Sequence, residues 1–165
     1  VIEYYVKLGF DFNHEPFSVP GTEFVEFYNT NFHRAKLHAN ALRILQSVLV
    51  SNRTQSILSA GKQSFLTNWV KDHGLSDYFI NVLGIDNHYA AGKIELGRAW
   101  MAELDFKDPE VILVGDTVHD SEVAEEIGSD CILVDQGHVT RRRLQETGRA
   151  VFNSLEQAWS YINSV

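Results

Sequence analysis

The chain has 165 residues, of which 44% are hydrophobic and 12% aromatic, so it can bury the core of one ordinary domain with a small appendage. This composition excludes an intrinsically disordered chain. The formal net charge is −8 at pH 7, which argues against nucleic acid or an anionic membrane surface as the partner. Cys131 is the only cysteine, so a disulfide framework is absent and a reducing cytoplasm is the expected location.

Residues 1–48 are rich in aromatic side chains and poor in strand-like runs, which predicts a helical region. Leu8-Gly9-Phe10 is typical of a helix end, and Pro20-Gly21 is expected to form a turn. Beyond that turn, aromatic residues recur at helical spacing, and we expect their stripe to be core: Phe24, Phe27, Tyr28 and Phe32. A further helix is expected from Leu37 to Leu45. We place a domain boundary between residues 48 and 49.

From Thr54 onward, strand patterns alternate with helix patterns on short loops. This alternation predicts an α/β fold with a Rossmann-like, doubly wound parallel sheet over residues 49–165. Strands are expected at 55–59, 79–83, 111–114, 131–134 and 150–152, with the last at an edge. Helices are expected after Gly61, from Lys93, from about Asp120 to Gly128, over 140–147 and over 155–162, and loops at 87–92 and 136–138.

The prediction of a functional site rests first on residues 111–128. Val111 to Val114 form an apolar run typical of a strand buried on both faces. Asp116 then lies at the carboxyl end of that strand, where α/β folds bind ligands, and Asp120 follows at the mouth of a helix. Two carboxylates suit a hard cation such as Mg²⁺. The alternative, equally supported by this stretch, is an N-cap for Asp120 and a loop acid for Asp116.

Two earlier segments add polar groups at the same predicted edge of the sheet. Ser59 lies at a strand tip, and Ala60 and Gly61 let backbone N–H groups approach an anion at a helix N-terminus. The alternative for Ser59 is an ST-turn or an N-cap. Lys93 opens a helix against the preference of the helix dipole; the alternative is a solvated surface lysine. Together, a hydroxyl, an ammonium and two carboxylates meet the needs of phosphoryl transfer.

In this order, Ile57-Leu58-Ser59, the helix-opening Lys93 and Val114-Gly115-Asp116-Thr-Val-His-Asp120 resemble motifs two, three and four of the haloacid dehalogenase-like superfamily. The resemblance is closest to its phosphoglycolate phosphatase and β-phosphoglucomutase branch, and the first 48 residues resemble part of its helical cap. The resemblance implies Mg²⁺-dependent phosphoryl transfer through an aspartyl-phosphate.

The resemblance also implies a role for each matching residue. Ser59 would hydrogen-bond the phosphoryl group, with Ala60 and Gly61 beside it. Lys93 would steady the charges of phosphate and nucleophile. Asp116 would bind Mg²⁺, and Asp120 would be a direct or water-bridged ligand. Gly137-His138 would lie near the rim of the active site, whereas His119 is expected to be structural or at the rim.

One motif of the superfamily is missing from this sequence. The first motif, a strand ending in Asp-x-Asp-x-Thr, supplies the nucleophile and the general acid/base. Asp11-Phe-Asn13 is a superficial match, but Asn13 cannot act as an acid and no Thr follows at the required place. The chain begins without Met, so we expect the first strand to lie upstream and the chain as given to be inactive.

The leading hypothesis is therefore a cytoplasmic phosphatase of small phosphorylated metabolites, of which this chain is a fragment. The nearest alternative is a phosphomutase of the same superfamily. A non-catalytic binding or regulatory domain is the alternative from another class, because the nucleophile is missing. The sequence does not indicate the substrate or the oligomeric state.

Overall fold

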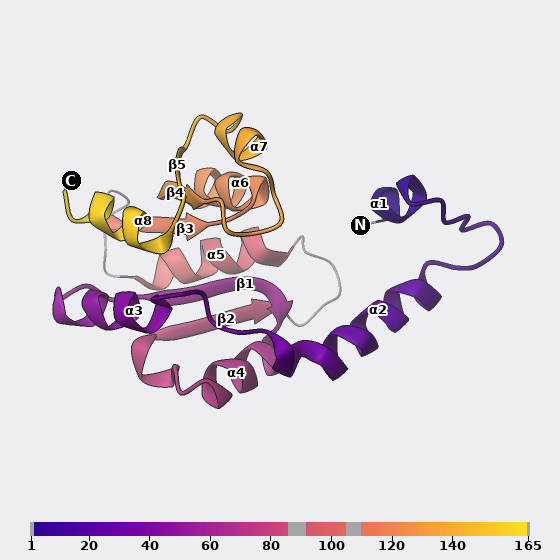
Figure 1. Cartoon of the computed structure of the whole chain (residues 1–165), viewed down its shortest axis with the longest axis horizontal. Coiled ribbons are helices and arrows are strands. Elements are labelled where there is room, and N and C mark those ends of the chain that lie inside the picture. The colour runs from indigo at the N-terminus through magenta and orange to yellow at the C-terminus, as the bar shows by residue number, and fades with distance from the viewer. Residues whose placement is uncertain (1, 86–91, 105–109, 165) are drawn as a thin grey trace. The chain divides into compact units, whose positions relative to one another are not determined.

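A computed structural model describes residues 2–85, 92–104 and 110–164 (Figure 1). Contacts between residues divide the chain into two compact units, Val1–Ala39 and Asn40–Val165. Most of the expected loop at 87–92 lies outside the described residues. No described helix is long and apolar enough to cross a membrane.

The first unit consists of short helices: α1 (Ile2–Lys7), α2 (Ser18–Asn31) and the 3₁₀ helix η1 (Phe32–Arg34). The helix end expected at Leu8-Gly9-Phe10 is confirmed, because α1 stops at Lys7 and Gly9 adopts a φ of +97°. The turn expected at Pro20-Gly21 is wrong. Both residues lie in the first turn of α2, where a missing proline N–H costs no helical hydrogen bond.

The aromatic stripe of α2 is not core, contrary to the prediction. Phe24, Phe27 and Tyr28 are each more than half exposed, and Pro20 is the only buried residue of the helix. The helix that this spacing predicts is confirmed, but periodicity shows only that one face of a helix is apolar. Burial needs a second element to pack against that face, and the described part of the first unit offers only short helices.

The second unit alternates strands and helices as predicted. In chain order its elements are α3 (Ala41–Val50), β1 (Ser56–Lys62), α4 (Gln63–Asp72), η2 (Ser76–Tyr78), β2 (Asn81–Ile85), α5 (Gly92–Glu103), β3 (Ile112–Gly115), α6 (Val118–Ile127), β4 (Asp130–Val134), α7 (Arg141–Gln145), β5 (Ala150–Phe152) and α8 (Leu155–Ile162). Helix α3 packs against α8 and belongs to this unit, although the expected boundary at 48/49 assigned most of it to the other.

Every strand pairing is parallel, as the α/β prediction requires, but the described strands form two sheets. One sheet has the order β1-β2, and the other has the order β3-β4-β5. Strand β3 therefore has a partner on one side only. The expectation that 111–114 is buried on both faces is wrong, because Val114 is 44% exposed. Strand β5 is an edge strand, as predicted.

The hydrophobic core is built around β4, whose side chains alternate between two packed faces. Cys131 and Leu133 cluster with Ala124 of α6 and Leu144 of α7. Ile132 and Val134 cluster on the other face with Ala158 of α8 and its neighbours. An apolar run buried on both faces is what a central parallel strand requires. The core thus fixes β4, and with it the neighbouring end of β3 that carries the candidate site.

Helix α5 connects this core to the other sheet. A Cβ at Gly97 would lie 3.0 Å from the Ile127 side chain of α6 and 3.1 Å from the Leu58 side chain of β1. The absence of a side chain at Gly97 thus lets α5 pack closely against both elements. This packing places the first turn of α5, which carries Lys93, beside the first turn of α6.

Candidate active site

The loop between β3 and α6 holds Asp116 and Asp120 in different environments. Thr117 is the N-cap of α6, and its hydroxyl accepts a hydrogen bond from the Asp120 amide at 3.1 Å. In return, Asp120 Oδ2 accepts from the Thr117 amide at 2.9 Å and the Thr117 hydroxyl at 2.7 Å. This is a capping box, in which two free N–H groups of the helix end are satisfied reciprocally. The helix ends at Gly128, as predicted, with a φ of +72°.

Lys93 and Asp120 form a buried ion pair. Lys93 Nζ lies 2.5 Å from Asp120 Oδ1, and each residue is only 7% exposed. The expectation of Lys93 at the start of a helix is confirmed, and the alternative of a solvated surface lysine is wrong. Burial alone would raise the pKa of Asp120, but the hydrogen bond and charge of Lys93, with Thr117, hold that pKa below its ordinary value.

Both oxygens of the Asp120 carboxylate accept hydrogen bonds from protein donors. Oδ1 receives Lys93, while Oδ2 receives the Thr117 groups and the Asp116 amide at 3.1 Å. A metal ion bound directly to Asp120 would have to compete with these donors for the carboxylate oxygens. Through these hydrogen bonds, Asp120 links α5 to the loop that carries Asp116. Its assignment as a metal ligand stays a prediction.

The side chain of Asp116 is the uncommitted carboxylate of the loop. Within residues 2–85, 92–104 and 110–164 it makes no hydrogen bond or ion pair, although its own amide is held by Asp120. A Cβ at Gly137 would lie 1.8 Å from Asp116 Oδ2. Gly137 thus provides the space that this carboxylate occupies. An oxygen atom without a protein donor is what a hard cation needs.

Arg141 holds the segment that contains Gly137, a role that the sequence analysis did not anticipate. Its guanidinium donates to Asp135 Oδ2 at 2.8 Å and to the carbonyl oxygen of Val151 at 2.8 Å, and also pairs with Asn153. These acceptors lie at the ends of β4 and β5. The run of three arginines gave no signal that its first member differs from the others, because the acceptors are distant in sequence.

Ser59 lies near the end of β1, but the local geometry differs from the prediction. Strand β1 runs to Lys62 and α4 begins at Gln63, so the helix does not start at Ala60-Gly61. Ser59 Oγ accepts a hydrogen bond from the Gly61 amide at 3.0 Å. This is the ST-turn that the sequence left open as an alternative. The hydroxyl proton remains available, because Oγ acts here as an acceptor.

Of the predicted site residues, the structure connects Lys93, Asp120 and the Asp116 backbone through hydrogen bonds. Among the described residues, the side chain of Ser59 makes its hydrogen bond only within its own turn and forms none with those three. The described residues contain no cluster of three or more His, Cys, Asp or Glu side chains that could hold a metal ion. The loop thus offers a metal ion the Asp116 carboxylate rather than a complete ligand set.

His119, which the sequence analysis assigned a structural or rim position, pairs through Nδ1 with Glu122 Oε2 at 2.9 Å. Its Nε2 atom is buried and has no hydrogen-bond partner. Among the described residues, the His119 ring pairs with Glu122 of its own helix and forms no hydrogen bond or ion pair with the side chains of Lys93 and Asp120, so the geometry gives it no role in that ion pair.

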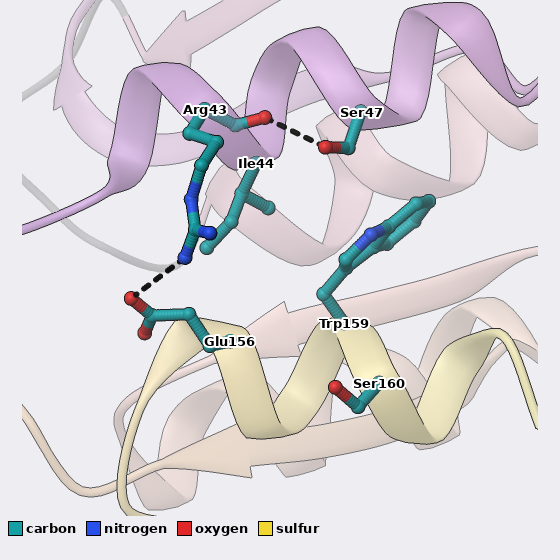
Figure 2. Close-up of a pocket in the computed structure, with 6 residues that line it drawn as sticks. All are labelled: Arg43, Ile44, Ser47, Glu156, Trp159 and Ser160. Carbon is teal, nitrogen blue, oxygen red and sulfur yellow. Dashed lines mark hydrogen bonds and ion pairs between the residues drawn. The ribbon is translucent and has the colours of Figure 1, made fainter.

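A pocket of about 270 Å³ lies elsewhere, between α3 and α8. Figure 2 shows Arg43 of α3 reaching toward Glu156 of α8, with Trp159 beside them. The two charges pair at 3.6 Å, and Arg43 is largely exposed. None of the predicted site residues lines this pocket, and its ion pair is solvated, so we assign the candidate chemistry to the Asp116 loop instead.

Comparison with known proteins identifies relatives of the chain. The family model described as haloacid dehalogenase-like hydrolase matches residues 10–134. Phosphoglycolate phosphatases of two Vibrio vulnificus strains, YJ016 and CMCP6, are each 25% identical over 107 residues, which is 64% of this chain and 47% of the relative. The chain therefore spans about half the length of the curated relatives it matches.

Solved structures share the fold at low sequence identity. A predicted phosphatase from Clostridium acetobutylicum has a TM-score of 0.72 at 20% identity, covering 88% of this chain and 77% of the other. A haloacid dehalogenase-like family protein from Streptococcus pneumoniae has a TM-score of 0.72 at 17% identity, with 86% and 69% covered. Protein tyrosine kinase A from Mycobacterium tuberculosis has a TM-score of 0.79 at 13% identity, with 96% and 74% covered.

Proposed function

Because the chain belongs to the haloacid dehalogenase-like hydrolase family, we propose that it forms part of a Mg²⁺-dependent phosphatase that acts on small phosphorylated metabolites through an aspartyl-phosphate. The observation that carries the proposal is the buried Lys93–Asp120 pair beside the Asp116 carboxylate, which has no partner within the described part of the chain. The Lys93 ammonium group can bind a phosphoryl group, and the Asp116 carboxylate at the end of a parallel strand can bind a metal ion.

Lys93 supplies the fixed positive charge. Its partner Asp120 offsets the cost of burying the ammonium group, which would be several kcal/mol for an unpaired ion. Only one of the three ammonium protons is needed for that hydrogen bond. The other two can be donated to phosphoryl oxygens or to an attacking carboxylate, without any rearrangement of the side chain at the moment of reaction.

Asp116 would hold Mg²⁺, and the residues present fit that role in part. The Asp116 carboxylate has no hydrogen-bond donor among the described residues and projects toward Gly137. Asp120, with both oxygens occupied, fits a water-bridged contact better than a direct one. Mg²⁺ retains several waters in most protein sites, and when bound it neutralises charge on the phosphoryl oxygens. Ser59 and the backbone of Ala60 would donate hydrogen bonds to those oxygens, with Gly61, whose amide donates to Ser59 Oγ, beside them.

The nucleophile is assigned to a segment outside residues 1–165. Asp11, the nearest match within the chain, accepts hydrogen bonds from the backbone and side chain of Asn13 in an exposed turn of the first unit. This is an Asx-turn rather than a strand end. Strand β1, which contains Ser59, and strand β3, which precedes Asp116, each lack a partner on one side within the described part of the chain. A strand bearing the nucleophile would pair with these free edges.

The proposal is tested with a longer form of the protein that contains an upstream Asp-x-Asp-x-Thr strand. We expect Mg²⁺-dependent release of phosphate from p-nitrophenyl phosphate, and the 165-residue chain alone should show none. Asp116→Asn should lower kcat by roughly 10²- to 10³-fold, as expected for loss of a transition-state charge contact. Asp130→Asn at the exposed start of β4 is the matched control. Unchanged turnover in Asp116→Asn would refute the assignment.

The alternatives give different results in the same assay. A phosphomutase would convert one sugar phosphate into an isomer and release little free phosphate. A non-catalytic domain would lack the upstream carboxylates, and its full-length form would show no turnover under any metal condition.

A further inference from the structure

The end of β1 contains an irregularity in its pairing with β2. Ser56, Ile57 and Leu58 pair with Asn81, Val82 and Leu83, and the next pair is Lys62 with Ile85. The three residues Ser59, Ala60 and Gly61 therefore lie opposite Gly84 alone. A bulge of this kind leaves the extra residues of the bulged strand unpaired and disrupts the ladder of hydrogen bonds locally. These residues are those proposed to bind the phosphoryl group.

Gly84 lies directly under this bulge. A Cβ at that position would be 2.7 Å from the carbonyl oxygen of Gly61 and 2.8 Å from Cα of Gln63. Both neighbours are backbone atoms, so neither could move aside without shifting the chain. The bulge therefore rests against the backbone of β2, and whatever holds Gly84 also fixes the position of Gly61.

The side chain of Gln63 holds Gly84 in place through hydrogen bonds to the backbone of β2. Gln63 Oε1 accepts a hydrogen bond from the Gly84 amide at 2.5 Å, and Nε2 donates to the carbonyl oxygen of Val82 at 2.9 Å. One carboxamide thus bonds an N–H and a C=O of the same strand, as the peptide group of a neighbouring strand residue would. A third hydrogen bond, from Nε2 to Thr67 Oγ1 at 3.0 Å, lies within α4.

From this geometry we propose that Gln63 is the positioning residue of the Ser59–Gly61 bulge, with its side chain standing in for the strand residue that the bulge removes. It anchors the first turn of α4 to β2 and so fixes both ends of the segment that carries the Ser59 hydroxyl. The consequence for phosphoryl binding rests on the function proposed above, whereas the consequence for the conformation of the bulge does not.

The conformational part is tested by amide hydrogen exchange and NMR on the 165-residue chain. Gln63→Met keeps the length of the side chain and removes all of its hydrogen bonds. Exchange of the Gly84 amide should rise roughly three- to tenfold, the change expected for the loss of about one hydrogen bond, and the amide resonances of Ser59 and Gly61 should move. Thr67→Val, which removes only the bond within α4, should leave them in place.

The amide of Ile132 in β4 serves as the internal reference, because its exchange reports the stability of the whole unit. Two results would overturn the proposal: unchanged exchange at Gly84, or faster exchange at Gly84 with unmoved resonances at Ser59 and Gly61. The second result would show that Gln63 pairs with β2 without setting the bulge.

The functional part uses a double-mutant cycle in the longer protein. If Gln63 acts through Ser59, then Gln63→Met should lower kcat/KM in the Ser59 background but change it less than twofold when Ser59→Ala is already present. Equal effects in both backgrounds would overturn the coupling. Absence of phosphoryl transfer in the unsubstituted protein would refute the proposed function alone, and the exchange experiment would still decide whether Gln63 positions the bulge.

Discussion

Lys93 Nζ lies 2.5 Å from Asp120 Oδ1, and both residues are almost completely buried, although 27 positions separate them in the sequence. The pair joins the first turn of α5 to the capping box of α6. Because each charge is the main partner of the other, removal of one leaves its counterpart buried without compensation. The Lys93–Asp120 pair and the packing near it lead to predictions for stability, for its pH dependence and for the reactivity of Cys131.

Lys93→Met should lower the free energy of unfolding by about 3–5 kcal/mol, the usual cost of leaving one member of a buried ion pair alone. Urea unfolding followed by circular dichroism measures this change. Arg98→Met, which removes the exposed pair of Arg98 with Glu126, is the matched control and should cost about 1 kcal/mol or less. Equal losses in the two variants would contradict the assignment of Lys93 to a buried pair.

The Lys93–Asp120 pair should also make stability depend on acid pH. The pKa of Asp120 is lower in the folded protein than its ordinary value of 3.8, so the unfolded chain binds the proton more tightly. The stabilisation is therefore complete above about pH 5 and is lost as the pH falls through the folded-state pKa, below 3.8. Comparison with Asp120→Asn, by urea unfolding in EDTA between pH 3 and 7, isolates this component. A pH dependence that is the same in both proteins would contradict it.

Cys131 should be unreactive in the folded chain. Burial raises the pKa of its thiol to about 11, with smaller contributions from neighbouring charges, so the thiolate is scarce at pH 8. Its position in the core cluster also blocks reagents. Labelling by Ellman's reagent at pH 8 should be slow in buffer and become fast in denaturing urea. Rapid labelling in buffer would place Cys131 outside the core.

Gly137→Ala should disturb Asp116. The added Cβ would lie 1.8 Å from Asp116 Oδ2, so the carboxylate or the loop must move, at a cost of about 1–3 kcal/mol for overpacking. Thermal unfolding measures this cost, and Mg²⁺-dependent turnover of the longer protein should fall with it. Gln136→Ala, at the exposed neighbouring position, is the control. Wild-type stability and turnover in Gly137→Ala would show that Gly137 does not define the space around Asp116.

Much of the second unit was predictable because local patterns decide where helices and strands begin and end. The alternation after Thr54, the position of Asp116 behind an apolar strand, and the stop of α6 at Gly128 all rest on neighbours within a few residues. The aromatic stripe of α2 failed as a core prediction for the opposite reason. Its spacing is local, but burial depends on a packing partner that no local pattern specifies.

By itself, the sequence determined the α/β class, the strand-end position of Asp116 and the place of Lys93 at the start of α5. Only the tertiary structure decided which of the two carboxylates, Asp116 or Asp120, accepts hydrogen bonds from protein donors. Asp120 is held by Lys93 from a different helix, whereas the Asp116 carboxylate occupies the space that a side chain at position 137 would fill. It also decided that a glutamine, Gln63, completes the pairing of β2 where β1 bulges. The physical reason is that the state of a polar group depends on the donors and charges that surround it in space, and these come from chain segments tens of residues away.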